Sequence, residues 1–190
     1  MSSPRLVATD LDGTLLGSDG QVSPRTRRVL EDLDAAGVTV VFVTGRPVRW
    51  MDSLWEHVGD HGIAICSNGG VVYDVHEHRV VTARTISRDV GLETADLVRS
   101  VAPASRFALE RVAGFATEPN FRSHSSDAGR RTDLLVGPLD EVFGDDVVKM
   151  LALDNEADPA TYRTVVDRTV GHLVTTTYSV VGSLVEMSAA

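Results

Sequence analysis

A short apolar run that ends in two aspartates constrains the fold of this chain more than any other feature. Residues 7–14 read VATDLDGT. Buried strands of parallel sheets are such apolar runs, and open α/β sheets bind ligands at the carboxyl ends of their strands. Because residues two apart on a strand face the same way, we expect Asp10 and Asp12 to converge on one point. An Asp-Gly turn accounts for Gly13 but not for a second carboxylate there.

Two further apolar runs also end in polar residues. Residues 40–43 lead into Thr44-Gly45-Arg46, and residues 63–66 lead into Ser67-Asn68-Gly69. Helices are expected between the three strands, at residues 26–36 and 48–58. Ser23 supplies an N-cap for the first helix, with Pro24 at its first position, and Gly37 supplies the C-cap. This β-α-β-α-β order predicts parallel strands with right-handed crossovers, as in a Rossmann-like half-sheet.

The pattern changes after residue 70. A hairpin is expected from residues 71–74 and 80–82. Its polar connection contains His76 and His78, which could share a metal but fit better as an exposed turn. A polar loop is expected at residues 123–132. The remaining expected elements are helices at 89–101 and 159–170 and strands at 107–112, 114–117, 147–153, 172–178 and 184–187. Residues 82–187 are thus predicted to form an inserted α+β unit.

Composition limits the partners of the chain. The net charge of −9 argues against nucleic acid, because phosphate backbones need a basic surface. No apolar run approaches the roughly 20 residues that span a bilayer, so no membrane partner is expected. We find no secretory signal pattern. The single cysteine, Cys66, can form no disulfide within the chain, which fits a reducing compartment and predicts a cytoplasmic protein.

The three strand-end motifs resemble those of the haloacid dehalogenase (HAD) superfamily of phosphohydrolases. Asp-x-Asp-Gly-Thr at residues 10–14 is similar to the first motif, and Thr44 after an apolar strand is similar to the second. Asn-Gly-Gly at residues 68–70 resembles the Cof-type branch. The resemblance implies an α/β fold with two parts. Residues 1–81 would be a Rossmann-like core with an incomplete parallel sheet, and residues 82–187 an α+β cap of type II.

The resemblance also implies a function. The chain would be a Mg²⁺-dependent phosphatase that acts on a small phosphorylated metabolite, such as a sugar phosphate, through an aspartyl-phosphate. Asp10 would be the nucleophile and Asp12 the general acid/base, and both would bind Mg²⁺. The residues that would bind the phosphate are Thr44, Gly45, Arg46 and Asn68. A surface arginine at a helix start is an equally good interpretation of Arg46, and an Asn-Gly turn is an alternative for Asn68.

The end of the sequence departs from the family pattern. After Glu186 and Met187, relatives continue into a third-motif lysine and a Gly-Asp-x-x-Asn-Asp segment. We therefore expect a truncated chain that binds Mg²⁺ weakly and turns over slowly. The alternative is a catalytically inactive phosphate-binding or interaction module. Without the fourth-motif strand, residues 6–9 would form an apolar sheet edge, which predicts self-association through the incomplete core sheet.

Overall fold

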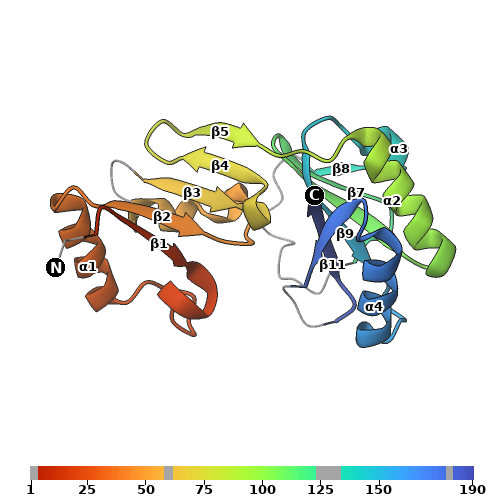
Figure 1. The fold of residues 1–190 in the computed structure, drawn as a ribbon, viewed down its shortest axis with the longest axis horizontal. Coiled ribbons are helices and arrows are strands. Elements are labelled where there is room, and N and C mark those ends of the chain that lie inside the picture. The colour runs from red at the N-terminus through yellow and green to blue at the C-terminus, as the bar shows by residue number, and fades with distance from the viewer. Residues whose placement is uncertain (1–3, 58–61, 123–133, 179–181) are drawn as a thin grey trace. The chain divides into compact units, whose positions relative to one another are not determined.

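The chain divides into two compact units, which are described separately. The computed structural model describes residues 4–57, 62–122, 134–178 and 182–190. Unit 1 is Met1–Ala83 and unit 2 is Arg84–Ala190 (Figure 1). The predicted polar loop at residues 123–132 lies outside the described residues. Within the described residues, no helix has both the length and the apolar character that crossing a membrane requires.

Unit 1 is built on a five-stranded sheet with the strand order β1-β2-β3-β4-β5. The first three strands pair in parallel, which confirms the predicted half-sheet. β4 and β5 continue the sheet antiparallel, as the predicted hairpin requires. Their connection holds the side chain of His76 62% exposed, in agreement with a polar turn. The strands are β1 (Leu6–Asp10), β2 (Thr39–Val43), β3 (Ile63–Cys66), β4 (Val71–Asp74) and β5 (Arg79–Ala83).

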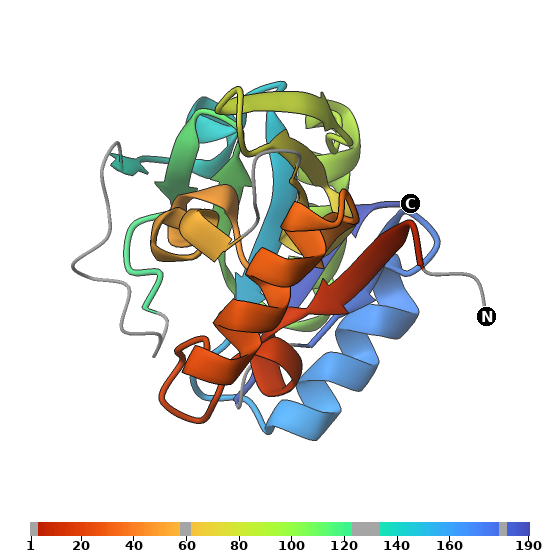
Figure 2. The same cartoon turned by 90° about the vertical axis from the view of Figure 1, so that its left-hand side faces the viewer.

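The helix α1 (Pro24–Ala35) begins and ends where its sequence signals place it. The Ser23 hydroxyl accepts a hydrogen bond from the Thr26 N–H at 3.1 Å, which satisfies one of the otherwise unpaired first-turn donors. The chain leaves the helix through Gly37 at a φ of +70°, a conformation that glycine adopts without steric cost. α1 packs against β2 (Figure 2). This packing fixes the first crossover beside the strands that carry the motifs.

The predicted helix at residues 48–58 is wrong. Two short 3₁₀ helices stand there instead, η2 (Val48–Trp50) and η3 (Asp52–His57). The buried side chains of Met51, Leu54 and His57 recur every three residues. That spacing matches the three residues per turn of a 3₁₀ helix, whereas an α-helix would rotate them off one face. Residue 58, expected on the same face, lies outside the described residues.

Unit 2 contains a six-stranded sheet with the order β10-β11-β9-β6-β7-β8. All neighbours pair antiparallel except β7 and β8, which are parallel. The short β8 and α3 were not predicted, and the other elements were. The strands are β6 (Arg106–Arg111), β7 (Gly114–Thr117), β8 (Leu134–Val136), β9 (Val147–Leu153), β10 (Val174–Thr177) and β11 (Val185–Ala189). The helices are α2 (Arg88–Val101), α3 (Leu139–Val142) and α4 (Pro159–Val170).

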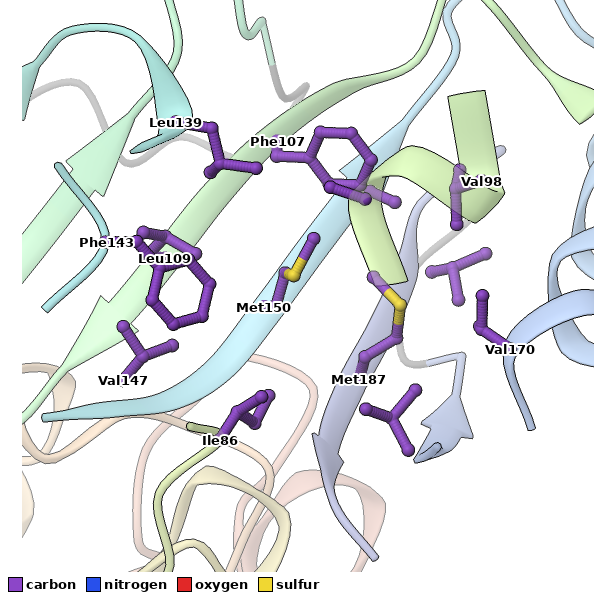
Figure 3. Packing of buried hydrophobic residues seen from close by; sticks show 14 of the residues in the cluster. Ile86, Val98, Phe107, Leu109, Leu139, Phe143, Val147, Met150, Val170 and Met187 are labelled. Atoms are coloured by element: carbon purple, nitrogen blue, oxygen red, sulfur yellow. The ribbon is translucent and has the colours of Figure 1, made fainter. Parts of the chain in front are cut away.

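The core of unit 2 lies between this sheet and its helices. Figure 3 shows Phe107 of β6 and Met150 of β9 among side chains from α2 and α4, including Val98 and Val170. All four are fully buried. Burial of one such side chain contributes roughly 1.5–3 kcal/mol, so this cluster supplies the main driving force for folding the unit.

Candidate active site

A pocket of about 410 Å³ opens in unit 1 at the carboxyl ends of the parallel strands. This is the place where open α/β sheets bind their ligands. Among the described residues, its lining combines one carboxylate with small polar and apolar groups from β1, β2, β3 and the turns that follow them. The lining residues are Asp10, Val43, Thr44, Gly45, Ile65, Asn68 and Gly69.

Hydrogen bonds tie the turn after β2 to the turn after β3. The Thr44 N–H donates to the Ile65 carbonyl at 2.9 Å, and the Ser67 N–H donates to the Arg46 carbonyl at 2.9 Å. Ser67 and Asn68 have φ values of +54° and +57°, which side chains other than glycine adopt rarely. Such strain persists only where the surroundings enforce it, and it gathers at functional sites. The two turns therefore form one rigid wall of the pocket.

Gly45 and Asn68 meet at this wall, although 23 positions separate them in the sequence. A Cβ atom added to Gly45 would lie 2.6 Å from Asn68 Oδ1. Only a glycine at position 45 lets the Asn68 side chain approach so closely. Gly45 and Asn68 were both predicted as site residues, and the structure places them together with Thr44 at the pocket.

If the pocket binds phosphate, as the resemblance of the strand-end motifs implies, substituting Gly45 with alanine should weaken the binding of inorganic phosphate on the order of tenfold, the worth of one hydrogen bond to a charged group. The new methyl group would push the Asn68 amide out of its position. Isothermal titration of the chain with phosphate measures the change.

The double variant Gly45→Ala/Asn68→Ala is the matched control for this substitution. It removes the clash, so its phosphate affinity should equal that of Asn68→Ala alone. Equal affinity in Gly45→Ala and wild type would show that the Gly45–Asn68 contact has no part in binding.

Asp12 lies beyond the strand that carries Asp10, so the alternation of side chains along a strand does not relate the two carboxylates. β1 ends at Asp10, and the next five residues form the tight turn η1 (Leu11–Leu15). Gly13, at a φ of +77°, follows Asp12 directly in a backbone conformation that favours glycine. Asp10 remains at the strand end and lines the pocket, and Thr14 donates its hydroxyl hydrogen to Asp10 Oδ2 at 3.3 Å. Thr14 thus orients Asp10, a role that we did not predict.

The Asp12 carboxylate is instead paired with Arg46. Arg46 Nε lies 2.9 Å from Asp12 Oδ2 and Nη2 lies 2.5 Å from Oδ1, so one guanidinium contacts both oxygens. The Arg46 side chain is 24% exposed and that of Asp12 is 60% exposed. Arg46 was predicted to contact phosphate. In the structure its guanidinium is paired with the carboxylate of Asp12, 34 residues earlier in the chain.

The described residues hold no cluster of three or more His, Cys, Asp or Glu side chains that would form an all-protein metal cage. A site with one or two carboxylates still suits Mg²⁺, which keeps several waters and takes further ligands from a substrate phosphate. The donor chemistry of Asp10 and Asp12 fits that ion.

Val43, Ile65 and Gly69 also line the pocket, and their position directly beside the predicted motifs was the signal that could have identified them.

Comparison with known proteins places these features in a family. A family model described as haloacid dehalogenase-like hydrolase matches residues 7–188. A Streptococcus pyogenes protein, named as a candidate phosphatase, is 36% identical over 104 residues, which are 52% of this chain and 38% of that protein. The HMP-PP phosphatase of Yersinia pestis is 43% identical over 70 residues, 37% of this chain and 26% of that protein. The matched stretches thus span less than half of either relative.

Solved structures agree with the fold. The structure of the HAD subclass IIB sugar phosphatase BT4131 has a TM-score of 0.72 and 16% sequence identity, and the match covers 97% of this chain and 70% of that one. Since the identity is low, this match supports the fold alone. The family model spans nearly the whole chain and includes the strand-end motifs at residues 10–14, 44 and 68–70. The chain therefore belongs to the haloacid dehalogenase-like hydrolases, as those motifs predict.

Proposed function

We propose that this chain carries the phosphate-binding and nucleophile side of a phosphatase that acts on a small phosphorylated metabolite. The observation that supports this most is the pocket at the ends of β1, β2 and β3, which Asp10 lines together with Thr44 and Asn68. In this proposal unit 1 is part of the catalytic core and unit 2 is the type-II cap. The buried single cysteine, Cys66, fits a reducing, cytoplasmic setting.

The chemistry assigned to the two aspartates is phosphoryl transfer in two steps. An Asp10 oxygen attacks phosphorus, the bond from phosphorus to the ester oxygen breaks, and Asp12 gives a proton to that oxygen. Asp12 then takes a proton from the water that attacks phosphorus, which releases phosphate and restores Asp10. Thr44 and the Asn68 amide would hold the phosphate oxygens while charge spreads over them.

A magnesium ion belongs to this proposal. Asp10 and Asp12 would hold it, and when bound it would neutralise charge on the transferring phosphoryl group. For the substrate we propose a sugar phosphate or a molecule of similar size. A pocket of about 410 Å³ is within the usual range for small-molecule sites. The relatives support a phosphorylated substrate, because they are named as phosphatases.

Beryllofluoride, which takes the place of a phosphoryl group on an aspartate, tests the proposal directly. With Mg²⁺ present, the wild-type chain should show protein-bound ¹⁹F resonances that inorganic phosphate displaces. A parallel assay follows phosphate release from an aryl phosphate. Bound fluoride without turnover would favour an inactive phosphate-binding module, and the absence of any bound signal would remove both functions.

We also propose self-association through β1. β1 stands at the edge of the described sheet, with Leu6 55% exposed. An edge strand presents unpaired N–H and C=O groups to another chain. Light scattering should therefore show a mass that rises with protein concentration. Ala8→Lys, which places a charge on the exposed side of the strand, should reduce this rise of the mass with concentration. A monomer at every concentration would contradict this prediction.

A further inference from the structure

The ion pair between Arg46 and Asp12 suggests how the site changes when it binds phosphate. Asp10 lines the pocket. Neither Asp12 nor Arg46 belongs to the described residues that line it. Both Asp12 oxygens contact the Arg46 guanidinium. A general acid must point an oxygen at the leaving group, within about 2.6–3.2 Å. In the structure, both Asp12 oxygens are therefore occupied by Arg46 rather than available to a leaving group.

The two partners are not held equally firmly. The backbone of Arg46 is anchored at both ends, since its N–H donates to Thr44 Oγ1 at 3.1 Å and its carbonyl accepts from the Ser67 N–H at 2.9 Å. Its side chain is also the more buried of the pair, 24% exposed against 60% for Asp12. Asp12 lies in the turn η1, immediately before the positive φ of Gly13. Asp12 is thus the partner that can move.

We propose that Arg46 is a positioning residue that holds Asp12 outside the pocket until a phosphate group replaces Asp12 on the guanidinium. A guanidinium can donate two parallel hydrogen bonds either to a phosphate or to a carboxylate, so the two anions compete for the same N–H groups. A phosphorylated ligand would therefore release Asp12 for proton transfer, and the empty site would keep it paired. This inference rests on the proposed function, because it requires that the pocket bind phosphate.

Opposite effects of two substitutions on phosphate affinity would reveal this competition. Asp12→Asn frees Arg46, so inorganic phosphate should bind about two- to fivefold more tightly, the worth of a partly exposed ion pair. Arg46→Ala removes the shared donor and should weaken binding on the order of tenfold. Arg79→Ala is the matched control, since Arg79 pairs with Asp74 in the β4–β5 hairpin at 3.6 Å, and it should leave the affinity unchanged.

The double variant Asp12→Asn/Arg46→Ala separates competition from simple charge repulsion. If Arg46 mediates the effect, Asp12→Asn should give no tightening once Arg46 is absent. The Nε–H resonance of Arg46 gives a direct reading, and it should shift both on phosphate addition and in Asp12→Asn. Equal tightening with and without Arg46, or an Nε–H signal that phosphate leaves unmoved, overturns this inference alone. A wild-type chain that binds no phosphate overturns the inference together with the proposed function.

Discussion

Replacing Asp10 with asparagine should abolish the trapping of beryllofluoride. Asparagine has nearly the same shape but cannot bond to the beryllium as a carboxylate does, and it cannot attack phosphorus. Asp10 is the carboxylate that lines the pocket, and Thr14 orients it by a hydrogen bond. Any phosphate release by the chain should fall by at least about 10³-fold, as with other lost nucleophiles. Bound ¹⁹F resonances and aryl phosphate turnover measure the two effects.

Asp12→Asn is the matched comparison for this variant. Trapping requires a nucleophilic carboxylate but no proton transfer, so Asp12→Asn should still bind beryllofluoride while hydrolysis stops. Equal trapping by the wild type and by Asp10→Asn would remove the assignment of the nucleophile. Loss of trapping in Asp12→Asn but not in Asp10→Asn would show that Asp12 is the nucleophile and Asp10 the general acid/base.

Replacing Lys149 with methionine should lower the free energy of unfolding of unit 2 by about 3–5 kcal/mol, the usual cost of breaking a buried ion pair. Lys149 Nζ lies 2.7 Å from Glu186 Oε2, and the two side chains are 4% and 6% exposed. Glu110 is also buried and stands opposite Lys149 in the β6–β9 ladder. Without the lysine, the buried Glu186 carboxylate would lose this ion-pair partner, and the buried Glu110 would stand opposite an uncharged side chain in the ladder.

The double variant Lys149→Met/Glu186→Leu should recover much of this loss, because replacing both members of a buried pair with apolar groups is often nearly neutral. Denaturant unfolding followed by hydrogen exchange of the β9 and β11 amides measures the stability of unit 2. A single variant as stable as the wild type would show that the pair contributes little.

Much of the fold could be predicted because its signals are local. Ser23 and Pro24 mark the start of α1 and Gly37 follows its end, and each apolar run corresponds to a strand. The 3₁₀ helices at residues 48–57 could not be separated from an α-helix, since Met51 and Leu54 fit both spacings. β8 pairs with β7 across residues 118–133, and such distant pairing leaves no mark in a strand of three residues.

The site shows the same division between local and distant information. The strand-end positions of Asp10, Thr44 and Asn68 followed from the apolar runs before them. The place of Asp12 did not, because the rule for residues two apart fails as soon as the strand ends at Asp10. The pairing of Asp12 with Arg46 joins residues 34 positions apart, and no periodicity could predict it.

The division of the chain into two uninterrupted stretches bears on how it folds during synthesis. Every strand of the β1–β5 sheet comes from the first 83 residues, and every strand of the second sheet comes from the remainder. Domains fold largely as units while the chain is made, N-terminal part first. All five described strands of the first sheet therefore leave the ribosome before β6 is translated. The order of synthesis thus favours pairing of β1 to β5 with one another over pairing with strands of the second sheet.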